Sequence, residues 1–493
     1  MKSIFKKLSR TANRGQAILL IALAMVGLVA FVGMMTDGGL LLIEYGKLKR
    51  GIDAAAIASS QQFRRGFNGA DLAAAARNFL ILNESDSSQI SIFRCKEDDL
   101  LVVDGTEHDA DLCTTPSRKL VRVEAVRTVN FGFLRVVGIN SYDITASSVG
   151  EAASIDLVLV IDTSTSMAYD TYTGAGATSG LNVVDSSGNP VDDEDPSVCN
   201  DSVSTPCEPL ATVKDVALEF LDTMYFPYDR VAVVAFTSQP PNDTRFHTTV
   251  LPLTDDQSDV EDAISDLKVF NPPVCDLNAS PKSPYEGPCR NYDVGGTFEG
   301  YDCPRFRDTG DLSTCNSSNI GGAMSRAWVE FSTGVVRADA LWITILLAGG
   351  PANATDGDGS TIPAGGVAPP SNEFPFGYCP VLSPPCRDGD ASSRHSPGDT
   401  DYDADDFARD AADDVADPLS GGGITIYTIG LGPLIQNAPL GDPDGAEQLL
   451  EYIADVAGGV DASHGFYSYA PTTSQLDDIF ASIAENIFTK IAK

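Results

Sequence analysis

Three patterns of apolar and polar positions follow one another along the chain. Residues 17–35 carry no charged side chain, and at about 1.5 Å per helical residue they cover the roughly 30 Å hydrocarbon core of a bilayer. Residues 67–152 contain one short helical segment and then strands with alternating apolar side chains. From residue 153 onward, near-continuous apolar runs alternate with segments of helical periodicity, which predicts a mostly parallel sheet flanked by helices.

The apolar N-terminal segment favours a single helix in the cell membrane with the rest of the chain exported. Lysines and arginines precede it, at Lys2, Lys6, Lys7, Arg10 and Arg14, and such a basic flank stays cytoplasmic. The alternative is a cleaved signal peptide. The apolar run is longer than a typical signal sequence, no convincing small-residue cleavage site follows it, and helix-forming residues continue to about Phe63. We therefore predict a leader, a membrane helix and its outward extension over residues 1–66.

The remaining chain is predicted to form a small extracytoplasmic α+β domain, 67–152, and a Rossmann-like α/β domain, 153–493. The apolar runs of the second domain predict strands at 155–162, 229–238, 248–253, 340–350, 423–432 and 465–470. The helical segments lie at 210–224, 257–267, 317–331, 406–419, 446–457 and 474–491. Polar stretches rich in Gly, Pro, Ser and Asp interrupt this order near 169–209, 270–316 and 351–405, and we expect them to be surface insertions.

Charge and cysteine content limit the partners and the compartment. The net charge is −36, and residues 1–66 carry ten Lys/Arg against three acidic residues, so nucleic acid is not an expected partner of the acidic body. Ten cysteines lie outside the predicted core strands and favour disulfides in an oxidising compartment. Zinc is the alternative, but no C-x-x-C occurs and the chain has four histidines. A nearest-neighbour pairing would join Cys95 to Cys113, Cys199 to Cys207, Cys275 to Cys289, Cys303 to Cys315 and Cys379 to Cys386.

Candidate chemistry gathers at the end of the strand in IDLVLVIDTSTSM, residues 155–167. Asp162, Ser164 and Ser166 follow the apolar run, where open α/β sheets present ligands. One carboxylate and two hydroxyls form an oxygen-only set that suits Mg²⁺ or Ca²⁺ better than Zn²⁺. A polar turn between strand and helix is the alternative reading of the same residues.

The D-x-S-x-S pattern resembles the metal-ion-dependent adhesion site of von Willebrand factor A (VWA) domains, and the order of elements from 153 to 493 is similar to that family. The family's GTNIGGAL segment corresponds to SSNIGGAM here, so the resemblance implies Ser318 as the third hydroxyl ligand. Thr297, in GGTFEG, is a rival that lacks the following helix. In this family an acidic side chain from the partner completes the coordination of the metal.

One family ligand is missing. The strand at 340–350 ends in Ala-Gly-Gly where the family has Thr-Asp-Gly, so Gly349 replaces an aspartate. Because one carboxylate remains, we expect weakened or ligand-dependent metal binding, or none. Asp356 and Asp358 follow closely, but a simple turn explains them better.

A second cation loop is a weaker hypothesis. Alternating acids occur at Asp399, Asp401, Asp403 and Asp405, as in the first half of a Ca²⁺ loop, but Ala404 stands where an EF-hand needs glycine. The alternative is an acidic lead into the next helix, where negative charge suits the helix dipole.

The N-terminal segment carries a second resemblance. Residues 14–66 are similar to the start of the TadE/TadG-like family of Flp pilus-assembly proteins, with Arg-Gly before the apolar helix, an acidic-glycine step, and Asp53 followed by alanines. Similarity continues more weakly through residues 119–152. This resemblance implies a membrane-anchored protein of a Tad/Flp-type pilus system, with pilus components among its partners.

These observations lead to two functional hypotheses and argue against an enzyme. The first is a non-enzymatic, membrane-anchored surface protein that binds a protein ligand or a surface through a degenerate VWA adhesion site. The alternative is a pilin-like filament or tip subunit that assembles through its N-terminal helix and displays the domain as an adhesin head. Loss of about the first sixteen residues would favour the filament. The chain has no G-x-S-x-G, P-loop or H-E-x-x-H motif, so we expect no catalysis.

Overall fold

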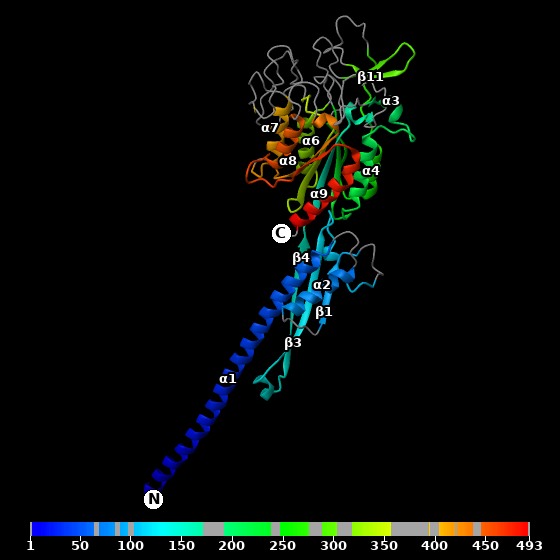
Figure 1. Cartoon of the computed structure of the whole chain (residues 1–493). Helices are drawn as coiled ribbons and strands as arrows, with labels where there is room; N and C mark the ends of the chain where they lie inside the picture. The colour runs from blue at the N-terminus through cyan, green and yellow to red at the C-terminus, as the bar shows by residue number, and fades with distance from the viewer. Residues whose placement is uncertain are drawn as a thin grey trace. The chain divides into compact units, whose positions relative to one another are not determined.

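The computed structural model divides the chain into two compact units, Met1–Ala152 and Ala153–Lys493 (Figure 1). It describes residues 2–63, 69–83, 89–96, 103–170, 192–237, 247–275, 288–302, 318–355, 394, 404–419, 422–436 and 445–491.

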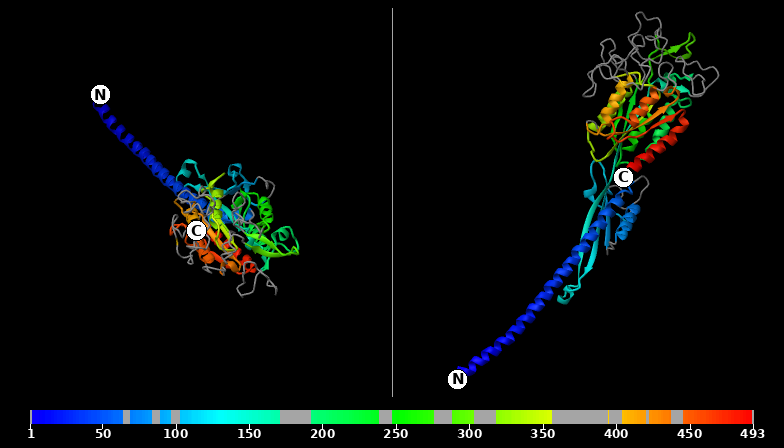
Figure 2. Two further views of the ribbon diagram at one scale, coloured as in Figure 1. Left: turned by 90° about the horizontal axis from the view of Figure 1, so that it is seen from above. Right: turned by 60° about the vertical axis from the view of Figure 1, so that its left-hand side comes forward.

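The first unit packs a long helix against a four-stranded sheet. Helix α1 spans Lys2–Ser60, and α2 spans Gly69–Leu82. The strands β1 (Gln89–Arg94), β2 (Glu107–His108), β3 (Lys119–Asn130) and β4 (Ser141–Ala152) form a sheet in the order β2-β1-β3-β4. The second half of α1 lies along β3 and β4, as Figures 1 and 2 show, and contributes buried side chains such as Leu48 and Ile52. A Cβ at Gly150 would collide with the Ala56 carbonyl oxygen, so a glycine is required where helix and strand meet.

The first half of α1 has a different environment. Its stretch from residue 17 onward is long and apolar enough to cross a membrane, judged by length and composition, and 6% of its most apolar window is buried within the protein. Large side chains from Ile18 (71% exposed) to Met35 (65% exposed) face outward on all sides of the helix. Within the described part of the chain, no protein core therefore covers this half of the helix.

A buried carboxylate joins α1 to the tip of the β3–β4 hairpin. Asp37, which is 2% exposed, accepts hydrogen bonds from the backbone N–H groups of Gly132 (3.0 Å), Phe133 (2.9 Å) and Leu134 (2.6 Å). The last of these residues begins a short 3₁₀ helix, η2 (Leu134–Val137). One side chain on α1 thus satisfies three consecutive donors of the tip.

The second unit is built on a six-stranded sheet in the order β14-β13-β12-β5-β8-β9. The strands are β5 (Ile155–Asp162), β8 (Arg230–Phe236), β9 (His247–Thr254), β12 (Leu341–Ala348), β13 (Thr425–Leu431) and β14 (Tyr467–Ala470). All neighbours pair in parallel except the edge strand β9, which is antiparallel to β8. The strands that follow β5 along the chain are added first on one side of it (β8, β9) and then on the other (β12, β13, β14). The sheet is therefore doubly wound, and its order reverses between β5 and β12.

Helices cover both faces of this sheet, as the alternating side chains of β5 require. Leu157 and Leu159 belong to a core with α4 (Leu210–Leu221), α5 (Gln257–Ser265) and α9 (Leu476–Ile491). Val158 and Val160 belong to a second core with α6 (Ile320–Ser332), α7 (Ala404–Ala416) and α8 (Gly445–Asp455) (Figure 1). The expected fold class is therefore confirmed: a mostly parallel, Rossmann-like sheet flanked by helices, with a long N-terminal helix and a small α+β region before it.

A buried ion cluster fixes the N-terminal end of β5. Asp156, 1% exposed, accepts two hydrogen bonds from the guanidinium of Arg230 at 2.9 and 2.6 Å and others from Arg337. Arg337 also donates to the carbonyl oxygens of Tyr228 (2.8 Å) and Ile155 (3.1 Å). Buried charges of this kind are tolerated because each has a partner of opposite sign and further hydrogen bonds.

The described parts of the insertions are small and disulfide-bonded. The first holds β6 (Tyr169–Asp170), β7 (Asp192–Asp193) and α3 (Pro196–Cys199), and the second holds β10 (Cys289–Tyr292) and β11 (Phe298–Asp302). Disulfides join Cys95 to Cys113, Cys199 to Cys207 and Cys275 to Cys289, the pairs that the nearest-neighbour prediction gave. Cys303, Cys315, Cys379 and Cys386, and most of 351–405, lie outside the described residues.

We predict that Asp37→Ala frees the hairpin tip. Without the carboxylate, the amides of Gly132, Phe133 and Leu134 lose their acceptor and exchange with solvent at least about tenfold faster. The reason is that losing a charge-assisted hydrogen bond usually costs more free energy than a tenfold change in exchange rate corresponds to. Hydrogen–deuterium exchange on the detergent-solubilised chain measures this, with Asp71→Ala on α2 as a control that leaves the tip unchanged. Unaltered exchange at these amides in Asp37→Ala would contradict the assignment.

Candidate functional site

The candidate site lies at the C-terminal ends of β5 and β12, where the order of the sheet reverses. Doubly wound sheets bind ligands at this place because loops diverge there and leave room between them. Thr163 fixes the departing chain: its N–H and its hydroxyl both donate to the Phe236 carbonyl oxygen, at 2.8 and 3.0 Å. A short 3₁₀ helix, η3 (Thr165–Met167), then turns the chain over the end of the sheet.

Asp162 is the centre of this site and is completely buried. One of its carboxylate oxygens accepts the Ser164 N–H at 2.8 Å, and the other accepts the Gly349 N–H at 2.9 Å. The carboxylate thus links the loop after β5 to the loop after β12. Because both loops are tied to one side chain, the geometry of the switch point is set by Asp162.

Three hydroxyls lie together with this carboxylate. The Ser164 and Ser166 hydroxyl oxygens are 2.7 Å apart, and the Ser318 hydroxyl donates to Ser164 at 3.3 Å. All three side chains are buried, with exposures of 7% or less. The structure therefore brings together the four residues that the sequence singled out, from two segments that are 154 positions apart along the chain.

Ser318 is held in place by residues that the sequence analysis missed. Its N–H donates to the Asn353 side-chain oxygen at 2.8 Å, and its carbonyl oxygen accepts the N–H groups of Asn353 and Ala354 at 3.1 and 3.2 Å. Next to it, Asn319 caps α6 by accepting the Gly322 N–H at 2.8 Å. The asparagine before a helix was a readable capping pattern, whereas nothing local marked Asn353.

The rival residues and the second cation loop have other surroundings. Thr297 lies in the β10–β11 turn, where its N–H donates to Asp293 at 2.7 Å. Asp405 lies at the start of α7 and forms an ion pair with Arg409 at 3.3 Å. Asp399, Asp401 and Asp403, as well as Asp356 and Asp358, lie outside the described residues.

The position of the missing aspartate is filled. A Cβ added at Gly349 would lie 2.8 Å from the Met167 sulfur and 3.0 Å from the Ser166 hydroxyl oxygen. Met167 is itself completely buried. The second carboxylate expected from the family pattern therefore has no room in this arrangement unless Met167 moves.

Electrostatically, Asp162 is a buried carboxylate with no counter-charge among the described residues. Burial raises the pKa of its carboxyl to about 6, while the hydrogen bonds from Gly349, Ser164 and Ser318 pull that pKa down in part. Among the described residues no lysine or arginine forms an ion pair with it. A cation at this place would offset the desolvation of the carboxylate.

The donor set fits a hard divalent cation in kind. Carboxylate and hydroxyl oxygens are the ligands that Mg²⁺ and Ca²⁺ prefer. The hydroxyls already satisfy one another without an ion, and only one negative charge faces the site, which is fewer than a tight Mg²⁺ site usually has. The arrangement therefore suits weak cation binding that a further acidic ligand would strengthen.

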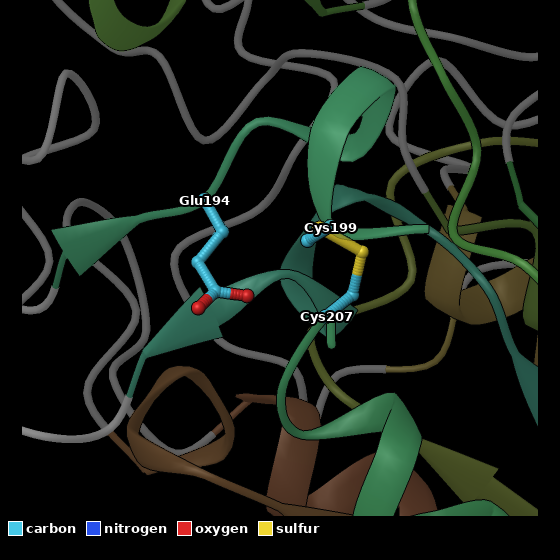
Figure 3. Close-up of side chains that lie close together, drawn as sticks. All are labelled: Glu194, Cys199 and Cys207. Carbon is cyan, nitrogen blue, oxygen red and sulfur yellow. A yellow bond between two sulfur atoms is a disulfide. The ribbon is translucent and has the colours of Figure 1, made fainter. Parts of the chain in front are cut away.

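A second cluster of metal-ligand atoms is not a metal centre. Glu194, Cys199 and Cys207 lie within 4.8 Å of one another (Figure 3). The two sulfurs are joined in a disulfide, so neither is a thiolate, the form that binds metals. One Glu194 carboxylate oxygen accepts the Glu208 N–H at 3.1 Å, which gives it a structural role at the base of the insertion.

No family model and no curated protein matches the chain. Among solved structures, it is similar to the pilus adhesin SpaC from Lactobacillus rhamnosus GG, with 11% identity, 76% of this chain and 33% of that chain covered, and a TM-score of 0.38. It is also similar to the pilus adhesin RrgA from Streptococcus pneumoniae (9% identity, 82% and 49% covered, TM-score 0.34) and to the SpRpn10 VWA domain (10% identity, 67% and 95% covered, TM-score 0.29). The chain spans about a third of SpaC and about half of RrgA.

We predict a pH-dependent cost of the buried carboxylate in the metal-free protein. The folded pKa of Asp162 (about 6) lies above its unfolded value of 3.8, so its contribution to stability is fully present below about pH 4 and is lost as pH rises through 6. Between pH 4 and pH 7.5, wild type should therefore lose up to about 3 kcal/mol more unfolding free energy than Asp162→Asn.

Urea unfolding in EDTA, followed by tryptophan fluorescence, measures this difference, because both tryptophans, Trp328 and Trp342, lie in the second unit. Asp215→Asn, an exposed acid on α4, is the control for removal of a charge. Equal pH dependence in wild type and Asp162→Asn would contradict the prediction.

Proposed function

We propose that this chain is a membrane-anchored, non-enzymatic surface protein that binds a protein ligand or a surface through a degenerate metal-ion-dependent adhesion site. The observation that carries the proposal is the meeting of Asp162, Ser164, Ser166 and Ser318 at the switch point of the sheet, with a buried carboxylate that lacks a cationic partner among the described residues. A site of this kind binds through its charge and donor geometry and needs no nucleophile.

In this proposal the cation supplies a positive centre for an acidic group of the partner. The Ser164, Ser166 and Ser318 hydroxyls would hold it directly, and Asp162 would hold it through a water molecule. Because Gly349 contributes no carboxylate, the protein alone binds the ion weakly, and a partner's carboxylate adds the missing negative charge. Affinity for the partner and affinity for the ion are then coupled to the same degree.

The rest of the chain supports a surface location. The exposed apolar part of α1 provides an anchor, and the disulfides of both units fit an oxidising compartment outside the membrane. The first two insertions, which carry the disulfides Cys199–Cys207 and Cys275–Cys289, contribute to recognition in this proposal. The resemblance of residues 14–66 to TadE/TadG-like proteins favours a Tad/Flp-type pilus system as the setting.

A pilin-like filament or tip subunit is the second candidate. It is favoured by the apolar side chains that α1 exposes beyond Asp37, such as Leu42 (70%), Ile43 (59%) and Ile57 (54%), which copies of the helix could bury against one another. Mass spectrometry of the N-terminus of the protein taken from its cells separates the two. A retained basic leader supports the anchor, and an N-terminus near Gln16 supports the filament.

We predict that Mg²⁺ or Mn²⁺ stabilises the second unit through Asp162. With the ion at about ten times its dissociation constant, the gain is about 1.4 kcal/mol. The measurement is urea unfolding of the full chain in detergent, at pH 7.5, as the ion is titrated. Asp162→Ala should lose the response and Asp215→Ala should keep it. If millimolar ion does not stabilise the wild-type protein, the metal-dependent mechanism is wrong.

We further predict that Gly349→Asp increases the response to the ion. The variant is less stable than wild type without metal, because its Cβ displaces Met167 and because it buries a second carboxylate beside Asp162. With Mg²⁺ it should gain more unfolding free energy than wild type. Gly349→Asn has the same shape without the charge, so its response should not exceed that of wild type. Equal gains in Gly349→Asp and Gly349→Asn would show that charge at this position is irrelevant to the ion.

A further inference from the structure

The tip of the β3–β4 hairpin has an unusual composition. Turns between strands are normally polar and rich in Gly, Asn, Asp and Ser. Residues 131–139 instead read FGFLRVVGI, with one charged side chain, Arg135. Several of the apolar side chains are open to the outside: Val136 is 87% exposed, and Phe133 and Ile139 are each 49% exposed.

This tip lies beside the end of the apolar span of α1. Contacts between the helix and the hairpin run from Ala56 beside Gly150, through Glu44 paired with Arg127 at 2.8 Å, to Asp37 and Gly33 at the tip. A Cβ at Gly33 would lie 2.6 Å from the Phe133 Cβ, so helix and tip are in close contact there. Since residues 17–35 form the apolar span, Phe133 is at the level of its last turn.

Several backbone N–H groups of the tip donate to acceptors within the protein rather than to water. Asp37 takes the N–H groups of Gly132, Phe133 and Leu134. Val136 donates to the Phe133 carbonyl oxygen at 3.0 Å, and Ile139 donates to the Leu134 carbonyl oxygen at 3.1 Å. Irregular backbone can enter the hydrocarbon region only when its polar groups are satisfied within the protein, and these contacts meet that need for five N–H groups of the tip.

Side chains next to the tip follow the order expected across a membrane surface. The exposed apolar side chains of Phe133, Val136 and Ile139 come first, then Tyr142, which is 58% exposed, and then Asp143. Tyrosine is enriched at the level of lipid headgroups, and a long cationic side chain such as Arg135 can reach the phosphates while its neighbours stay in the apolar region.

We infer that residues 131–139 form a second membrane contact, in which the hairpin tip inserts into the lipid surface beside the end of the apolar span. The inference rests on the membrane anchoring of the proposed function and adds a lipid-binding element that the anchor does not require. Continuity with the exposed apolar side chains of α1 favours lipid over a second copy of the chain. With two points of contact, helix and tip together hold the first unit at a fixed depth.

Tryptophan quenching by brominated lipids tests this inference. Val136→Trp is prepared in the full chain, reconstituted into phosphatidylcholine vesicles, and the emission of wild type is subtracted to remove Trp328 and Trp342. Leu23→Trp, within the apolar span, is the reference for anchoring, and Val103→Trp, at a residue of the same unit that is 99% exposed, is the control for an aqueous position. All three replaced side chains are largely exposed, so the fold should tolerate the changes.

We expect lipids brominated near the headgroup to quench Val136→Trp to an extent comparable with the quenching of Leu23→Trp by lipids brominated deep in the chain. Val103→Trp should be quenched by aqueous iodide instead. If Leu23→Trp is quenched by lipid and Val136→Trp by iodide, the tip is in water and this inference alone fails. If Val136→Trp is shielded from both quenchers, protein covers the tip, and contact between copies replaces lipid. If Leu23→Trp is not quenched by lipid, the anchor and the inference fail together.

Discussion

Strand β5 carries a buried carboxylate near each end, and the difference in how the two are compensated organises the second unit. Asp156 and Asp162 are six positions apart, so their side chains leave the same face of the strand. Asp156 meets the guanidinium groups of Arg230 and Arg337, which supply its counter-charge. Asp162 meets N–H groups and hydroxyls alone among the described residues, and burial raises its pKa to about 6. The negative charge of Asp156 is neutralised by arginines of the protein, whereas the described residues leave the charge of Asp162 to be neutralised by a proton or a cation.

Gly349 connects the two loops of the candidate site without a second carboxylate. At Gly349 the backbone N–H still binds Asp162, and the space beside its Cα is filled by Met167. Glycine at this position therefore connects the two loops through its backbone N–H and adds no second charge. A site with one carboxylate is easier to keep stable when empty than a site with two, because like charges buried side by side raise each other's pKa.

The sequence predicted the parts of this architecture that depend on local pattern. The apolar run of β5 and the hydroxyls that follow it could be read within one short stretch of sequence. Ser318 came from the resemblance to the VWA pattern, and three of the disulfides agree with a nearest-neighbour pairing that was only assumed. The supporting contacts could not be read in this way. Arg337 lies 181 positions from Asp156, Asn353 lies 35 from Ser318, and the Gly132 N–H lies 95 from Asp37. Polar contacts between residues so far apart in the sequence depend on which elements the topology brings together, and the periodicity of apolar positions does not predict them.

Asp37 shows the same principle at work in the first unit. Burying an acidic residue two positions beyond an apolar span costs free energy unless nearby hydrogen-bond donors compensate for its lost hydration. Here the carboxylate accepts three N–H groups of the tip, and those groups in turn would be costly to leave without an acceptor where helix and tip pack together. Each therefore removes the other's penalty. Asp162 does the same for the N–H groups of Ser164 and Gly349, but it lies at the switch point of the sheet beside three hydroxyls. This difference in surroundings makes Asp37 a structural contact and Asp162 a candidate binding residue.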